Sequence, residues 1–158
     1  MAPPFLQVFK AFIQSFGDMG DIIDMAIKAN DGKATYDVGE LTDRDTTGTI
    51  VSLTASSTKD LYLAGATVSL ILYGTGVQLV DYQIHLMRNT TTLEIWAYKA
   101  YIQSGDFDYS RTHIFKTVGA KVTTSETFSL NLAEVGTTCD VYGSIYGWQE
   151  DTGVGPEI

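Results

Sequence analysis

The sequence contains little cysteine, few basic residues and no long apolar run. Its single cysteine, Cys139, excludes an internal disulfide. The 10 Lys and Arg residues are scattered and outnumbered by 19 Asp and Glu, and the formal net charge is −9. Phosphate binding needs clustered cations, so we expect no nucleic-acid partner. No stretch reaches the roughly 18 consecutive apolar residues of a membrane span, and Met1-Ala2-Pro3-Pro4 lacks the basic start of a signal peptide.

Charged residues are also scarce, at 18 % against a typical quarter, whereas the chain has 9 Tyr, 7 Phe and 2 Trp. A surface poor in charge and rich in aromatic side chains is typical of surface that other subunits cover. At 158 residues the chain has the size of one domain with a substantial core.

Residues 1–31 are predicted to form an amphipathic helical arm. Apolar side chains recur at alternating steps of four and three, which is the spacing of a helical seam: Phe5, Phe9, Phe12, Phe16, Met19 and Ile23. Three partners remain open for this seam: a face of the protein's own sheet, other subunits, or a membrane surface. The membrane is disfavoured because the polar face of the arm carries more Asp than Lys. We take the seam as a candidate oligomer interface.

Residues 32–150 are predicted to form about eight strands, and residues 151–158 a C-terminal tail. The expected strands are 34–41, 47–54, 60–73, 77–87, 92–102, 111–116, 126–132 and 139–149. No helix-length segment interrupts them, which argues against parallel βαβ units. The fold class is therefore all-β with an N-terminal helix, a two-sheet antiparallel β-sandwich with jelly-roll-like topology.

Side-chain alternation assigns faces to several strands. Phe128, Leu130 and Leu132 are expected to point into the core, with the polar residues between them pointing outward. The segment 92–102 is apolar on both faces, so we expect its outer face to be covered by the N-terminal helix or by another subunit.

The residues that most often carry catalysis do not form a recognisable motif. The two histidines, His85 and His113, have no metal-ligand spacing, and neither is near Cys139 in sequence. No serine lies in a nucleophile-elbow pattern. We therefore expect a protein without enzymatic activity and without a cofactor.

Two carboxylate pairs are weak metal candidates. Asp106 and Asp108 lie two residues apart in a predicted loop, where hard oxygen ligands can hold calcium. Asp43 and Asp45 have the same spacing. A third ligand is not evident for either pair, so solvated loops are the preferred interpretation and no metal is assigned. Asn89 begins a glycosylation sequon that we interpret as a hairpin turn.

Exposed aromatic residues offer an alternative binding role. Tyr109, Tyr146 and Trp148 are candidates for a platform that stacks on sugar rings, although aromatic residues at subunit contacts are the commoner case.

The region from Asp60 to Glu150 resembles the jelly-roll modules of virus capsid decoration, head-fibre and tail proteins. The resemblance lies in Leu61-Tyr62-Leu63-Ala64-Gly65-Ala66-Thr67-Val68 and in the final Gly/aromatic run Val141-Tyr142-Gly143-Ser144-Ile145-Tyr146-Gly147-Trp148-Gln149-Glu150. It implies a symmetric oligomer, generally a trimer, without enzymatic activity, whose arm locks neighbours together, and it assigns no catalytic residue.

The expected function is that of a structural subunit at the surface of a virus particle, as a capsid, decoration or fibre protein. Its partners would be copies of itself and other virion proteins. The alternatives are a module that binds carbohydrate or a receptor, such as a host-surface glycan, at a virion surface, and a cellular filament or surface-layer subunit.

Overall fold

The computed structural model describes residues 34–73, 78–102 and 109–153, all in strands, turns and loops. The predicted arm, 1–31, and its seam lie outside the described residues, as do Asp106, Asp108 and most of the predicted tail. The described strands are β1 (Ala34–Arg44), β2 (Gly48–Thr54), β3 (Lys59–Leu72), β4 (Gln78–Arg88), β5 (Thr91–Ile102), β6 (Tyr109–Phe115), β7 (Lys121–Val122), β8 (Thr127–Glu134) and β9 (Cys139–Asp151).

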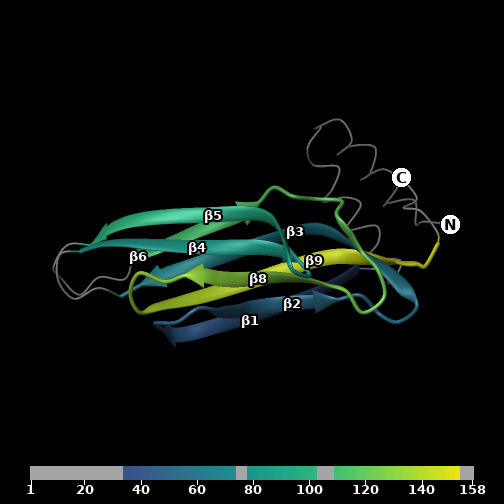
Figure 1. Ribbon diagram of the computed structural model, residues 1–158, viewed down its shortest axis with the longest axis horizontal. Coiled ribbons are helices and arrows are strands. Elements are labelled where there is room, and N and C mark those ends of the chain that lie inside the picture. Colours follow the sequence, from purple (N-terminus) through teal and green to yellow (C-terminus); the bar gives the residue numbers. More distant parts are fainter. Residues whose placement is uncertain (1–33, 74–77, 103–108, 154–158) are drawn as a thin grey trace, which may run out of the picture.

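The strands form two antiparallel sheets packed face to face (Figure 1). Sheet A has the order β1-β9-β3-β6, with the short β7 also paired to β3, and sheet B has the order β2-β8-β4-β5. β4 and β5 lie in the same sheet, as do β6 and β7, whereas every other pair of consecutive described strands lies in different sheets. Apart from the short β7, this is the strand order of a jelly roll, so the predicted two-sheet antiparallel β-sandwich is confirmed. The predicted N-terminal helix lies outside the described residues.

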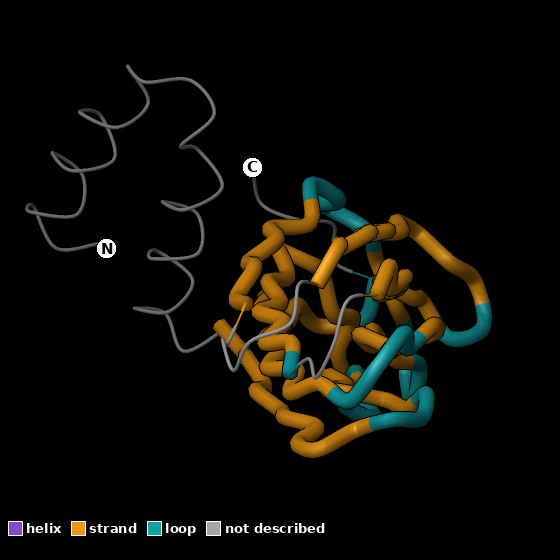
Figure 2. Tube along the Cα trace, turned by 90° about the vertical axis from the view of Figure 1, so that its left-hand side faces the viewer, coloured by secondary structure: helices purple, strands orange, loops and turns teal. Residues whose placement is uncertain are grey.

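The core lies between the sheets and follows the predicted alternation. Phe128 and Leu130 are fully buried and Leu132 is almost so, while β4 alternates buried Val80 and Ile84 with half-exposed polar residues. Seen from one end, the strands enclose this core (Figure 2). The pattern of period two in the sequence therefore reports correctly which face of each strand points inward.

The described residues of one chain do not cover the outer face of segment 92–102, and its cover by the N-terminal helix or another subunit stays a prediction. On β5 the outward side chains Ile95 and Tyr101 are exposed, at 52 % and 64 %. β5 is an edge strand of sheet B, with β4 as its neighbour on one side. The strand buried on both faces within the sandwich is β3, which is buried continuously from Asp60 to Ala66. β3 lies inside sheet A, between β9 and the edge formed by β6 and β7.

The predicted hairpin turn at Asn89 joins β4 to β5. Asn89 adopts a left-handed conformation with φ of 51°, which asparagine tolerates better than most residues. The side-chain nitrogen of Asn89 donates to the Glu126 carboxylate at 3.0 Å, and its side-chain oxygen, Oδ1, accepts from the backbone N–H of Thr127 at 2.9 Å. The turn thus ties the β4–β5 hairpin to the start of β8.

Among the described residues, no helix is long and apolar enough to traverse a lipid bilayer.

Candidate assembly surface

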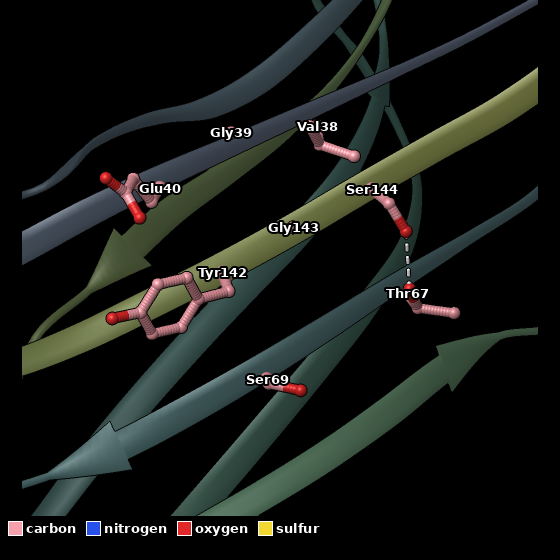
Figure 3. Close-up of a pocket in the computed structure, with 8 residues that line it drawn as sticks. All are labelled: Val38, Gly39, Glu40, Thr67, Ser69, Tyr142, Gly143 and Ser144. Carbon is pink, nitrogen blue, oxygen red and sulfur yellow. Dashed lines mark hydrogen bonds between the residues drawn. The ribbon is translucent and has the colours of Figure 1, made fainter.

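The outer face of sheet A carries a row of side chains that crosses all four long strands. Val38 of β1 pairs with Ser144 of β9, Ser144 pairs with Thr67 of β3, and Thr67 pairs with Ile114 of β6. Cross-strand partners share a face, so a large apolar residue stands at each end of the row and two small residues lie between. Figure 3 shows Val38, Ser144 and Thr67 in this arrangement.

The next row along the strands has its bulky residue on a middle strand. Glu40 pairs with Tyr142, which pairs with Ser69. The two rows enclose a hollow of about 530 Å³ lined by Val38, Gly39, Glu40, Thr67, Ser69, Tyr142, Gly143 and Ser144. We call the outer face around it the hollow face. Small residues of β3 and β9, flanked by Val38 of β1 and Tyr142 of β9, produce the depression, and Glu40 is the only charged residue among the described residues that line it.

The hydroxyl groups on the floor of the hollow are engaged within the sheet. Thr67 Oγ1 and Ser144 Oγ are 2.6 Å apart, and Ser69 Oγ lies 2.9 Å from Thr112 Oγ1. Because each hydroxyl already has a protein partner, covering the floor with an apolar group breaks no hydrogen bond between these side chains.

Large apolar side chains around the hollow are open to solvent. Their exposed fractions are 75 % for Tyr36, 64 % for Val38, 64 % for Ile114 and 38 % for Tyr142. Single exposed apolar residues are ordinary, but several on one face mark an interaction site. The hollow face therefore has the composition of an interface, with apolar and aromatic residues and little charge.

The outer face of sheet B differs in character. Lys99 Nζ lies 3.1 Å from Asp81 Oδ1 across the β4–β5 pair, and the amide of Gln83 donates to Glu134. This face also presents exposed Ile95, Leu79 and Tyr101, the last two paired at one end. Its centre is polar and hydrogen-bonded, so it is the weaker candidate.

Aromatic rings close the long side of the sandwich where β5 and β6 meet. The Trp96 indole of β5 stacks on the His113 ring of β6, with centroids 5.1 Å apart and planes at 4°, and His113 meets Phe115 edge-on. The Arg111 guanidinium lies 5.9 Å from the centre of the Tyr98 ring. These contacts hold the edges of the two sheets together.

Glu94 adds hydrogen bonds between β5 and the segment after β6. Its Oε2 atom accepts hydrogen bonds of 2.9 Å from the backbone N–H groups of Lys116 and Thr117 and from the Thr117 hydroxyl. Burial acts to raise the pKa of Glu94, but these hydrogen bonds and nearby His113 outweigh it and hold the pKa below its ordinary value. The carboxylate thus fastens the segment after β6 to β5.

The predicted sugar platform is divided by the sheet register. Tyr146 and Trp148 lie on the outer face of β9, where Tyr62 stacks on Trp148 with centroids 5.5 Å apart and planes at 9°. Tyr109 lies in β6 opposite Leu72, which pairs with Cys139 at the far end of β9. Nine residues of strand separate that end from Trp148, or about 30 Å. Tyr109 is therefore not brought together with the other two.

Cys139 is fully buried in the core, and its Sγ lies 3.6 Å from the carbonyl oxygen of Arg44. Burial, together with the nearby Asp140 carboxylate, raises the pKa of the thiol to about 11. A nucleophilic thiolate is thus disfavoured at neutral pH. Cys139 therefore serves as a core residue at the start of β9.

Asp43 and Asp45 are the carboxylate candidates that lie within the described residues. Asp43, at φ of 49°, donates its backbone N–H to Asp140 Oδ1 at 2.8 Å. Within residues 34–73, 78–102 and 109–153, no three His, Cys, Asp or Glu side chains gather closely enough to hold a metal ion. The calcium candidates Asp106 and Asp108 and the arm seam, Phe5 to Ile23, lie in segments that the structure does not describe.

The hollow itself was missed at the sequence level. Its floor residues come from β3 and β9, which are some 75 residues apart in the chain, and only the register of the sheet places them side by side. The available signal was the alternation of Tyr142, Ser144, Tyr146 and Trp148 on one face, which marks the face but not the depression in it.

Comparison with known proteins gives little to add to this geometry. No protein-family model and no curated protein matches the chain. A search of solved structures matches a structure of infectious bursal disease virus, Gx strain, at 15 % identity and a TM-score of 0.31, over 78 % of this chain and 35 % of that one. The chain thus spans about a third of the length of that viral chain. At this TM-score the likeness carries no argument, and the fold assignment rests on the order and pairing of the strands.

Proposed function

We propose that this protein is a non-enzymatic structural subunit of a virus particle, located at the particle surface as a capsid, decoration or fibre protein. It would assemble with copies of itself through the hollow face and the N-terminal arm. The observation that carries the proposal is the exposed apolar rim of the hollow face, with Tyr36 and Val38 on β1 and Ile114 on β6. Jelly rolls are frequent among capsid domains, which supports the virion assignment by analogy only.

The energetics indicate how such a contact would work. Burying an exposed Val, Ile or aromatic side chain contributes about 1.5–3 kcal/mol. Association costs an estimated 4–15 kcal/mol in lost freedom of motion. Val38, Ile114 and Tyr36 alone would therefore barely offset that cost, and a stable assembly needs more apolar surface. The arm, with its row of phenylalanines, is the segment of the chain that offers it.

A closed oligomer is the expected form, because closed symmetry satisfies every copy of an interface and leaves no apolar face exposed. A trimer agrees with the resemblance to virion modules. In this mechanism shape complementarity performs the function, and no reaction takes place.

Light scattering coupled to size-exclusion chromatography of the full chain tests the proposal. We expect a mass that is a small multiple of 17.2 kDa at micromolar concentration. Electron microscopy of the same fraction would then show discrete particles of uniform size. A monodisperse 17.2 kDa species across the accessible concentration range would contradict self-assembly.

The protein content of purified virions distinguishes a virion subunit from a subunit of a cellular filament or surface layer. The protein is expected to be present in stoichiometric amounts in gradient-purified particles, detected by mass spectrometry of the particle fraction. Its absence from particles, together with assembly in isolation, would favour the filament or surface-layer alternative.

A further inference from the structure

We infer that the hollow of sheet A is the receptor for the phenylalanine seam of a second copy's N-terminal segment, residues 5–23. This inference rests on the proposed function and deepens it, since it names the segment that fills the interface. Shape, chemistry and position each support this occupant.

The shape of the hollow suits bulky apolar side chains. Its floor is made of small residues, Ser144, Thr67 and Ser69, and its edge carries Val38 and Tyr142 (Figure 3). A void of about 530 Å³ is larger than a single benzyl group requires. Knobs on a helix insert best where the facing surface offers small residues surrounded by larger ones.

The chemistry of the floor favours an apolar occupant over a sugar. The Thr67 hydroxyl is hydrogen-bonded to that of Ser144, and the Ser69 hydroxyl to that of Thr112. Fewer hydroxyl groups are therefore available to hydrogen-bond a ligand. A sugar needs several such groups directed at it, whereas a phenyl ring needs contact area.

The sequence supplies that occupant. Phe5, Phe9 and Phe12 lie four and three residues apart, followed by Phe16, so a helix would present them along one edge spanning about 16 Å. No other segment of this chain has four phenylalanines at helical spacing.

Position makes an exchange between copies geometrically simple. Ala34, which follows the arm in the chain, pairs with Trp148 at one end of sheet A. Four residues of β1 separate it from Val38, or about 13 Å. The arm therefore begins close to the hollow face, within reach of a neighbouring copy that packs there. Among the described residues of one copy, nothing covers the rim side chains Tyr36 and Val38, which are largely exposed.

A complementation experiment with full-length chains tests the inference. Ser144→Trp fills the hollow but leaves the arm intact, and tryptophan is favoured in strands, so the fold should tolerate it. Phe9→Ser combined with Phe12→Ser weakens the arm but leaves the hollow intact. Each variant alone should show at least a tenfold weaker self-association by sedimentation velocity. An equimolar mixture should associate measurably more strongly than either, because the intact arm of one meets the intact hollow of the other.

Ser52→Trp is the matched control. Ser52 is an exposed serine on β2, on the outer face of sheet B, so the same bulky change there should leave self-association within twofold of the original protein. If Ser144→Trp fails to fold by circular dichroism, the exposed rim changes Val38→Glu and Ile114→Glu replace it.

The outcomes separate the two proposals. An original protein that is already monomeric contradicts the proposed function itself. If it assembles but Ser144→Trp behaves like Ser52→Trp, assembly stands and the hollow is not its receptor. If both variants dissociate but their mixture does not recover, the arm does not pass between copies and the inference is overturned.

Discussion

The α-carbon of Gly39 lies so close to β2 that a Cβ atom at this position would stand 2.0 Å from the carbonyl oxygen of Ile50. Gly39 faces inward from β1, the edge strand of sheet A, and Ile50 belongs to β2, the edge strand of sheet B. The two sheets therefore meet backbone to backbone along this long side of the sandwich. The opposite side, at β5 and β6, is held by aromatic side chains instead.

Gly39→Ala is expected to destabilise the fold. The new methyl group would meet the backbone of β2, which cannot rotate away, so the sheets must separate locally. Overpacking of this kind costs typically 1–3 kcal/mol, measurable as a lower midpoint in urea denaturation. Gly48→Ala is the control, because there a Cβ would meet the flexible end of the Arg44 side chain. Equal stabilities for the two variants would show that the contact at Ile50 is not tight.

Glu94→Gln is expected to reduce stability at neutral pH and to lessen its dependence on acid. The folded state holds the pKa of Glu94 below its ordinary value of 4.5, so the stability this carboxylate contributes is present above that value and lost as the pH falls through the lowered one. Removing the charge should cost about 1–3 kcal/mol at pH 7.

Chemical denaturation of this variant and of the original protein between pH 3 and pH 7 provides the measurement. The two stability curves should converge at the acid end. Glu40→Gln, at an exposed carboxylate on β1, serves as the control. If the free energy of unfolding of Glu94→Gln and of the original protein depends on pH in the same way, Glu94 does not contribute to acid sensitivity.

The stack of Tyr62 on Trp148 is expected to couple β3 to the end of β9. Aromatic pairs of this geometry contribute about 0.5–1.5 kcal/mol beyond the area they bury. A double-mutant cycle with Tyr62→Leu and Trp148→Leu should therefore give a coupling energy in that range. A coupling near zero would mean that the two rings contribute only through separate contacts.

Cys139 is expected to resist thiol reagents in the folded protein. With a pKa of about 11, only roughly one thiol in a thousand is ionised at pH 8. Labelling with a chromogenic disulfide reagent should be more than a hundredfold slower in buffer than in 6 M guanidinium chloride. Rapid labelling under native conditions would show that this end of β9 opens readily.

The sequence alone determined the strands and their faces, because side-chain alternation is a local property. The predicted strand 139–149 begins at the same residue as β9, and the predicted 47–54 differs from β2 by one residue. The short β7, at Lys121–Val122, was missed because two residues carry no period. The hairpin turn at Asn89 was likewise predicted from its turn residues.

Tertiary structure decided which strands lie in the interior of a sheet and which lie at its edge. The apolar pattern of 92–102 did not reveal that β5 lies at an edge of sheet B, where Ile95 is exposed in the single chain, nor that β3 is the strand buried on both faces within the sandwich. The hollow could not be predicted from the sequence, because Thr67 and Ser144 become neighbours only through the pairing of β3 with β9. Periodicity specifies which way a side chain points along its own strand, but its neighbours on either side are set by long-range pairing that leaves no local trace.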